Sequence, residues 1–146
     1  MTNSSSKRLD GRVALITGAA RGTGQPMGFG GATARLFSTE GAKVVVTDLD
    51  PGGVDATVAA IDAEGGTALG ILLDVTSEAD WQAAVERTVA EFGRLDILVN
   101  SAGTIHVHTV DQLPLKVFNQ QLDVHAKGVF LGTKHAIPVM RDRGGG

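Results

Sequence analysis

The sequence predicts an α/β fold in which a parallel sheet lies between two layers of helices. Short runs rich in β-branched residues alternate along the chain with longer segments of helical periodicity, which is the pattern of βαβ units. The 146 residues are 42% hydrophobic and 20% charged, as in a globular protein, and this length is typical of one domain.

Four runs are expected to form the strands. RVALIT (12–17) and KVVVTD (43–48) predict the first two, TALGILLDV (67–75) the third and LDILVN (95–100) the fourth. Right-handed crossovers give these strands the spatial order 3-2-1-4 of a three-layer Rossmann fold, with strand 4 at an edge. A ligand is expected at the carboxyl ends of strands 1 and 4, where the order switches.

The segments between the strands carry helical spacing. GATARLFSTE (31–40), DPGGVDATVAAIDAEGG (50–66) and SEADWQAAVERTVAEF (77–92) predict three crossover helices, and Ser77 is the expected N-cap of the third. The remainder, from Leu113 to Met140, is also expected to be helical.

Composition excludes several classes of function. Thirteen basic and sixteen acidic side chains give a net charge of −3, and no long Lys/Arg cluster indicates a nucleic-acid partner. The absence of cysteine excludes disulfides and thiolate chemistry. No apolar run approaches the roughly 20 residues of a membrane span. The polar start lacks a signal-peptide core, so residues 1–11 are expected to form a flexible tail before a domain at 12–146, in a cytoplasmic protein.

A glycine-rich segment follows the first strand and contains two G-x-G triplets. A dinucleotide's pyrophosphate approaches the backbone closely and binds free N–H groups at a helix N-terminus, so either triplet could serve. Counting from the strand favours the triplet at 22–24, whereas counting back from Asp48 favours the triplet at 28–30. Pro26 cannot lie inside a helix, so the helix must start at or after it. We therefore expect Gly28 and Gly30 at the helix start, with Gly18, Arg21 and Gly22 nearer the strand.

Asp48 ends the second predicted strand. A carboxylate there can accept hydrogen bonds from both ribose hydroxyls of an adenosine and would repel a 2′-phosphate. No Arg or Lys follows at positions 49 and 50, so NAD is favoured over NADP. The alternative is a solvated aspartate in a turn.

Four ordered motifs together resemble the short-chain dehydrogenase/reductase family, from about Arg12 to the end of the sequence. They are T-G-x-x-x-G-x-G after strand 1, Asp48, LDV (73–75) and NSAG (100–103). Compared with the family pattern, the glycine loop is six residues too long, by the length of GTGQPM. The alternative to a phosphate-binding role is that the extra glycines form a flexible loop that weakens cofactor binding.

The resemblance implies roles for the last two motifs. Asp74 would accept a hydrogen bond from the adenine amino group and Val75 would pack on the ring, although Asp74 could instead serve only the turn into the next helix. Asn100, Ala102 and Gly103 would lie near the ribose and nicotinamide and would tie the central strands together. Ser101 departs from the family's N-N-A-G, with a small polar side chain retained.

The resemblance also shows what the sequence lacks. Family members use a Ser, a Tyr as general acid/base and a Lys, helped by an Asn, but this sequence holds no tyrosine. The sequence is expected to be truncated before strand 5, and no catalytic residue is assigned. His125 stands at the Asn position and is expected to be a partly buried helix histidine, with a proton-relay role as the alternative, while His106 and His108 alone do not predict a metal site.

The resemblance thus implies an NAD(H)-dependent oxidoreductase acting on a small secondary alcohol or ketone, inactive as this 146-residue chain. The alternatives are a non-catalytic NAD-binding module and a degenerate product without a ligand. Family members are usually dimers or tetramers, so a homo-oligomer is compatible with the resemblance.

Overall fold

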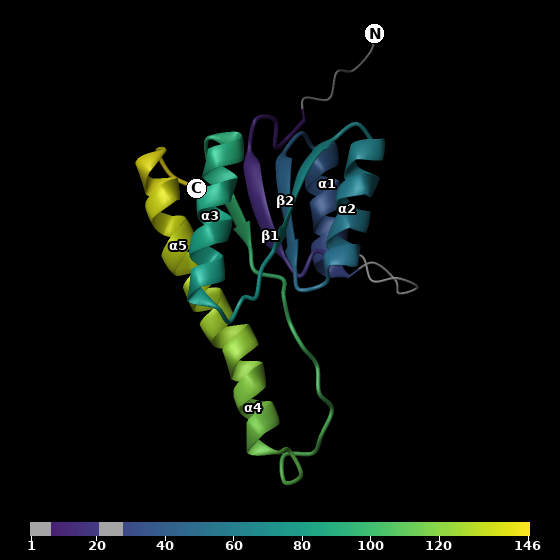
Figure 1. The fold of residues 1–146 in the computed structure, drawn as a ribbon, viewed down its shortest axis with the longest axis vertical. Helices are drawn as coiled ribbons and strands as arrows, with labels where there is room; N and C mark the ends of the chain where they lie inside the picture. Colours follow the sequence, from purple (N-terminus) through teal and green to yellow (C-terminus); the bar gives the residue numbers. More distant parts are fainter. Residues whose placement is uncertain (1–6, 21–27) are drawn as a thin grey trace.

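The predicted architecture is confirmed. A computed structural model describes residues 7–20 and 28–146, and there four parallel strands form one sheet in the order β3-β2-β1-β4. Helices cover both faces of the sheet (Figure 1). The strands are β1 (Val13–Thr17), β2 (Lys43–Asp48), β3 (Thr67–Leu72) and β4 (Ile97–Val99). The helices are α1 (Phe29–Thr39), α2 (Pro51–Ala63), α3 (Glu78–Phe92), α4 (Leu115–Leu122) and α5 (Gly128–Asp142), with a π-helical turn η1 (Asp123–Lys127) between the last two.

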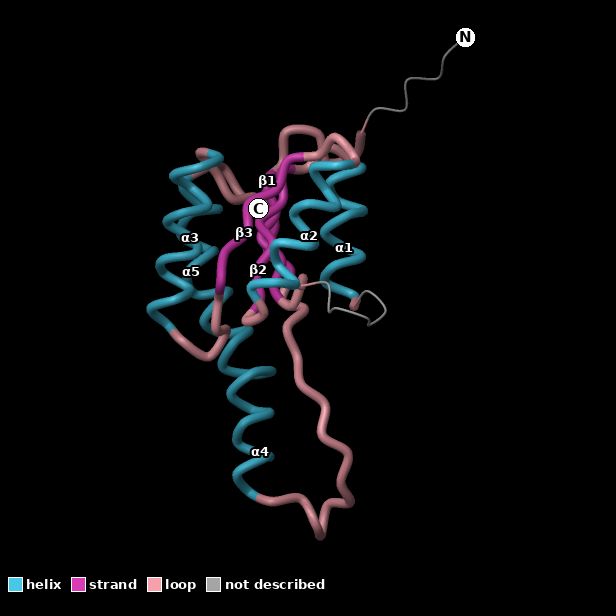
Figure 2. The backbone as a smooth tube through the Cα atoms, turned by 45° about the vertical axis from the view of Figure 1, so that its right-hand side comes forward, coloured by secondary structure: helices cyan, strands magenta, loops and turns pink. Residues whose placement is uncertain are grey.

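The two central strands are buried on both faces, which explains their continuous apolar character. Because side chains alternate along a strand, each strand contributes side chains to two separate hydrophobic cores, one on each face of the sheet. One core lies under α1 and α2 and the other under α3 and α5, which stand on opposite sides of the sheet in Figures 1 and 2. The first core includes Ala14, Ile16, Val44, Val46, Ala34 and Ile61; the second includes Leu15, Val45, Trp81, Ala84 and Leu131.

Polar side chains cap the N-termini of α2 and α3, and a glycine ends α3. The hydroxyl of Ser77 accepts a hydrogen bond from Asp80 N (3.3 Å), so the predicted N-cap of α3 is confirmed. Asp50 caps α2 in the same way by accepting from Gly52 N (3.1 Å). A left-handed glycine, Gly93 (φ 78°), ends α3.

Both edge strands are shorter than predicted. β3 ends at Leu72, because the chain then turns at Asp74 toward α3. β4 spans only three residues, because Asp96 belongs to a cluster of side-chain hydrogen bonds at its start and Asn100 has left the ladder. The predicted C-terminal helix is present, but η1 interrupts it.

Part of the predicted tail is held by the fold. Residues 7–11 form a turn in which Leu9 N donates to Glu40 O (2.9 Å), and the guanidinium of Arg8 pairs with the Glu40 carboxylate (2.9 Å). Leu9 packs against the core under α1. These five residues therefore differ from the expected flexible tail, whose residues 1–6 lie outside the described part of the chain.

Asp96 is a buried carboxylate at the amino end of β4, with 3% of its surface exposed. It accepts hydrogen bonds from Val13 N (2.9 Å), from Arg12 Nη1 (3.2 Å) and from both Nε (2.8 Å) and Nη2 of Arg94. Burial raises the pKa of Asp96, but these hydrogen bonds, those from Arg94 foremost, outweigh it and leave the pKa below its usual value. The ionised carboxylate thus fastens β4 to β1.

Replacing Asp96 with alanine is expected to lower the free energy of unfolding by about 2 kcal/mol, because the buried Val13 N–H loses its acceptor. The folded pKa lies below the unfolded value, so the carboxylate's contribution is complete above about pH 4 and is lost as the pH falls through the folded pKa. Denaturant titrations at pH 7 and at steps below pH 4 should therefore show the difference between wild type and Asp96→Ala shrinking. Asp55→Ala, on the exposed face of α2, serves as the control, and a difference that stays constant with pH would contradict this role.

Candidate functional site

The carboxyl ends of all four strands meet around one cleft of about 130 Å³. Such a position, outside the carboxyl ends of parallel strands and at the switch between β1 and β4, is where open α/β sheets bind ligands. Of the residues predicted to bind a cofactor, the cleft brings together Gly18, Asp48, Asp74, Val75, Ala102 and Gly103; Leu49, Leu73, Thr104 and Val124 complete its lining.

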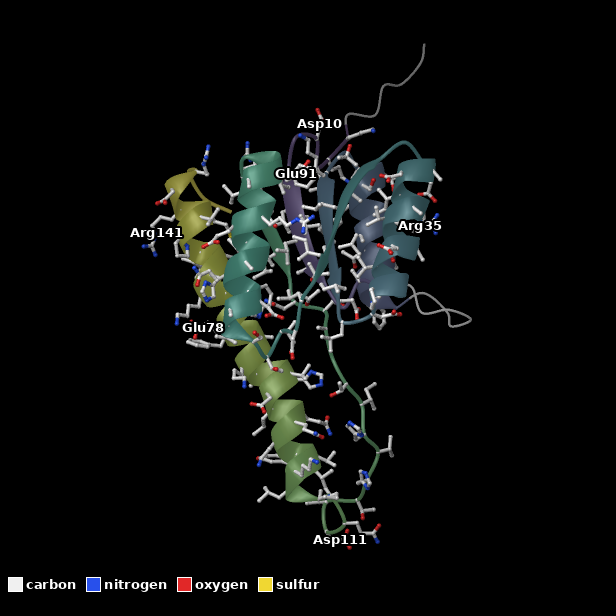
Figure 3. All side chains as sticks on the ribbon, in the orientation of Figure 1. Asp10, Arg35, Glu78, Glu91, Asp111 and Arg141 are labelled. Atoms are coloured by element: carbon white, nitrogen blue, oxygen red, sulfur yellow. The ribbon has the colours of Figure 1, made fainter. Side chains whose placement is uncertain are left out.

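A larger hollow of about 450 Å³ lies at the other end of the sheet, lined by residues such as Asp10, Gly41 and Gly66. Figure 3 shows Asp10 at the opposite end of the molecule from Asp111, which belongs to the loop beyond the cleft. This hollow contains none of the predicted site residues and faces the amino ends of the strands. The smaller cleft is therefore the candidate site.

The end of β1 is locked to the segment that follows β4. The hydroxyl of Thr17 accepts hydrogen bonds from the N–H groups of Ser101 and Ala102 (both 3.0 Å). Gly18 has a φ of 63°, and a Cβ there would lie 2.7 Å from Ala102 Cα. Only glycine fits this close approach of the two backbones. The Thr17 hydroxyl holds the two segments together. The sequence motif contained Thr17, but our prediction of the site residues omitted it.

The second G-x-G triplet lies at the start of α1, as expected. Gly28 is the N-cap of α1, and none of the described residues lies within 4 Å of a Cβ built on it, so they leave the first-turn N–H groups reachable. Gly30 is buried, and a Cβ on it would lie 2.7 Å from the Gly18 carbonyl carbon. Its role in the structure is to let α1 approach β1. Arg21, Gly22 and the first triplet lie outside the described residues.

Asp48 lies half-buried in the cleft wall. Its Oδ2 accepts from Ala20 N (3.1 Å), and its Oδ1 accepts from Leu49 N (2.7 Å) and Asp50 N (3.3 Å). A carboxylate offers about four acceptor positions, so with respect to the described residues Oδ2 has one left for a ligand hydroxyl. The same side chain thus anchors the start of the glycine loop and can accept from a ligand.

Asp74 and Val75 form the wall after β3. Asp74 Oδ1 accepts from both the N–H and the hydroxyl of Thr76 (2.8 Å each), so the turn role considered for this residue is real. Among the described residues, no hydrogen bond reaches Asp74 Oδ2. The Val75 carbonyl accepts from the indole N–H of buried Trp81 (2.9 Å), which fixes the backbone of this wall.

Asn100 does not join the cleft. It is exposed, its Oδ1 lies near Gly132 of α5, and it lines a separate hollow between β4 and α5. The predicted grouping of Asn100 with Ala102 and Gly103 is therefore not seen in this structure. The Asn100 side chain lies on the α5 side of the sheet, whereas Ala102 and Gly103 line the cleft at the strand ends.

His125 lies beside the wall of the cleft that follows β4. The residue is exposed rather than partly buried, and its imidazole contacts the backbone of Gly103 and Thr104. The sequence showed only its position after α4; the contact depends on η1, which no local pattern revealed. Within residues 7–20 and 28–146, no group of three metal-ligating side chains occurs.

Comparison with known proteins defines the class. The family model described as short chain dehydrogenase matches residues 12–146, and the chain belongs to this family. It is 43% identical over 139 residues to the 2,5-dichloro-2,5-cyclohexadiene-1,4-diol dehydrogenase LinX of Sphingobium indicum, covering 95% of this chain and 53% of that protein. It is 39% identical over 139 residues to the D-threitol dehydrogenase of Mycolicibacterium smegmatis, covering 95% of this chain and 51% of that protein.

A solved structure supports the same assignment. The chain superposes on a crystal structure titled as a short-chain dehydrogenase/reductase, from Burkholderia xenovorans, with a TM-score of 0.91 and 39% identity. That superposition covers 96% of this chain and 55% of the solved one. The chain thus spans about half the length of the relatives it matches. In the part of the chain that the structure describes, no helix is both long and apolar enough to cross a membrane.

Proposed function

We propose that this chain binds NAD(H) in the cleft and that it belongs to an oxidoreductase acting on a secondary alcohol or ketone. The observation that carries the proposal is the convergence of Gly18, Asp48, Asp74 and Gly103 from four strand ends on one cleft. The relatives are dehydrogenases of small alcohols by name, which supports the same reaction class.

A bound dinucleotide would extend from the start of α1 across the cleft to the segment after β4. The N–H groups at the start of α1, beside Gly28, would bind the pyrophosphate, and Gly30 and Gly18 keep that helix close to the strand. Arg21 and Gly22 belong to the same proposed phosphate loop. Asp48 would accept from the adenosine ribose, Asp74 from the adenine amino group, and Val75 would pack on the ring. Ala102 and Gly103 would lie against the nicotinamide end, with Asn100 supporting β4 from its other side.

Charge around Asp48 supports NAD over NADP. Asp48 and Asp50 place two carboxylates at the end of β2, and the residue between them is the exposed Leu49. A 2′-phosphate there would meet negative charge with no cation at positions 49 to 52. When bound, the nicotinamide supplies the hydride acceptor or donor of the reaction.

The sequence contains no tyrosine, so this chain lacks the family's general acid/base. We therefore propose binding without turnover for the 146-residue chain, which makes a non-catalytic NAD-binding module the second candidate function. Both candidate functions use the same cleft, and they differ only in whether hydride transfer to or from a substrate takes place.

The test is to mix the purified chain with NADH and then with a ketone. We expect NADH fluorescence to rise on binding, NADPH to bind at least about tenfold more weakly because of the repulsion at Asp48, and NADH absorbance to stay constant after ketone is added. Sustained NADH consumption would overturn the proposal of inactivity. An unchanged fluorescence, together with no competition by NAD, would overturn binding itself and favour a degenerate product.

Association between copies is part of the proposal. Large apolar side chains of α4 and α5 are exposed, which favours a homo-oligomer through these helices. They are Leu115, Phe118, Leu122, Val129, Phe130 and Ile137.

A further inference from the structure

One hydroxyl group of α2 reaches the segment that leaves β1. The side chain of Thr57 is fully buried, and its Oγ1 donates to Ala19 O at 2.9 Å, across 38 positions of the chain. Ala19 is fully buried as well, so its carbonyl cannot turn to water and needs a donor within the fold. Among the described residues, the Thr57 hydroxyl is the donor that this carbonyl finds.

The same hydroxyl has a local alternative inside its own helix. Thr57 Oγ1 lies 3.0 Å from Gly53 O, four residues earlier in α2, and such contacts are common for a threonine within a helix. A hydroxyl has a single proton to donate. The Gly53 carbonyl already accepts the Thr57 N–H in the regular helix, whereas the Ala19 carbonyl depends on the hydroxyl. The proton therefore favours Ala19.

The acceptor of this bond belongs to a peptide group that Asp48 also holds. The Ala19 carbonyl and the Ala20 N–H form one planar unit, with the oxygen and the hydrogen pointing in opposite directions. At the far end of this unit, the Ala20 N–H donates to Asp48 Oδ2 (3.1 Å). Turning the peptide over would bring the Ala19 carbonyl against the Asp48 carboxylate. By binding that carbonyl, Thr57 favours the orientation that offers the N–H to Asp48.

The orientation of the Asp48 carboxylate depends on this peptide. Its Oδ1 accepts from Leu49 N and Asp50 N, which belong to its own turn. Within residues 7–20 and 28–146, the Ala20 N–H is the donor that reaches the carboxylate from the end of another strand. It binds Oδ2, the oxygen that has an acceptor position left for a ligand hydroxyl. Thr57 thus acts on Asp48 from the buried side of the cleft wall, without lining the cleft itself.

We propose that Thr57 is a positioning residue for Asp48: its hydroxyl fixes the Ala19–Ala20 peptide, and this peptide holds Asp48 Oδ2 in the place where it meets the adenosine ribose. The inference rests on the proposed NAD(H) site for its consequence, while the hydrogen bonds themselves exist without a ligand. It assigns to Thr57 no contact with the dinucleotide.

The first experiment measures hydrogen exchange of the Ala20 amide in the unliganded chain. Thr57→Val keeps the shape of the side chain but removes the donor, and one net hydrogen bond corresponds to about tenfold in local opening. We expect Ala20 exchange about tenfold faster in Thr57→Val and close to wild type in Thr57→Ser, which keeps the hydroxyl. Thr88→Val is the matched control, because Thr88 is a fully buried threonine of α3 whose hydroxyl donates to the carbonyl four residues earlier (2.7 Å).

The second experiment titrates NADH into the same variants and repeats Thr57→Val in an Asp48→Ala background. We expect NADH affinity about tenfold weaker in Thr57→Val, and within about threefold of wild type in Thr57→Ser and Thr88→Val. In the Asp48→Ala background, Thr57→Val should change the affinity by less than about threefold, because the carboxylate that it positions is gone. A merely structural role would weaken binding equally in both backgrounds.

Three results would overturn the inference: unchanged Ala20 exchange in Thr57→Val, unchanged NADH affinity in that variant, or an equal loss of affinity in both backgrounds. If the wild-type chain itself binds no NADH, the proposed function fails and this inference fails with it. NADH binding by wild type, with the same affinity in Thr57→Val, overturns the inference alone. Should loss of protection at the core amides of β1 and β2 show that Thr57→Val does not fold, Thr57→Ala takes its place in both experiments.

Discussion

Replacing Gly30 with alanine is expected to push α1 away from β1 and to lower the free energy of unfolding by about 3 kcal/mol. The added Cβ would lie 2.7 Å from the Gly18 carbonyl carbon and 2.9 Å from Thr17 O, both backbone atoms that cannot rotate aside. Overpacking of this kind usually costs 1–3 kcal/mol, and here the gain in helix propensity is smaller than the clash. Denaturant unfolding measures the stability, and NADH titration should show weakened binding in the same variant.

The matched control is Gly28→Ala, two residues earlier. Among the described residues, a Cβ on Gly28 meets nothing within 4 Å, and its φ of −68° suits any residue. We expect a change of only a few tenths of a kcal/mol up to about 1 kcal/mol, from the weaker N-cap. Equal free energies of unfolding for Gly28→Ala and Gly30→Ala would contradict the close approach of α1 to β1.

Replacing Asp48 with alanine is expected to weaken NADH binding by ten- to a hundredfold. A hydrogen bond to a charged group contributes about 1.5–3 kcal/mol, which corresponds to that range. The preference for NADH over NADPH should shrink in the same variant, because the charge that repels a 2′-phosphate is gone. Competition titrations with both dinucleotides measure the two effects together.

Asp50→Ala controls for the general loss of negative charge at this edge, since Asp50 caps α2 and does not line the cleft. Its NADH affinity should stay within about threefold of wild type, although α2 loses about 1 kcal/mol of capping. Because Asp48 also accepts from Ala20 N, unfolding curves must accompany the titration. Equal NADH affinity in stable Asp48→Ala and wild type would show that this carboxylate does not contact the ribose.

The strand order was predictable because β-branched runs alternate with helical patterns, and only right-handed crossovers connect them. The central strands match their predicted bounds closely, since burial on both faces gives them an unmistakable apolar run. The edge strands do not, because Asp74 forms a local turn with Thr76 and because Asp96 binds Arg12 and Val13, which lie far away in the sequence. Hydrogen-bond networks of this kind leave no periodic signal in the sequence.

The lining of the cleft was predictable where residues lie at or shortly after the carboxyl end of a strand, as at Gly18, Asp48 and Gly103. It was not predictable where packing decides the direction of a side chain. Asn100 faces α5 instead of the cleft, and Thr17 and His125 hold the segment after β4 through contacts that span the chain. Cytoplasmic location and the absence of a nucleic-acid partner stay predictions.

The most direct test of the account is to map the dinucleotide on the chain by backbone amide chemical shifts during an NADH titration. We expect the largest shifts at Gly18, Leu49, Val75 and Gly103 around the cleft, and at the start of α1, with little change at Gly41 and Gly66 at the opposite end of the sheet. Shifts that gather instead in that opposite hollow, or no shifts at any NADH concentration, would contradict the assignment of the cleft as a dinucleotide site.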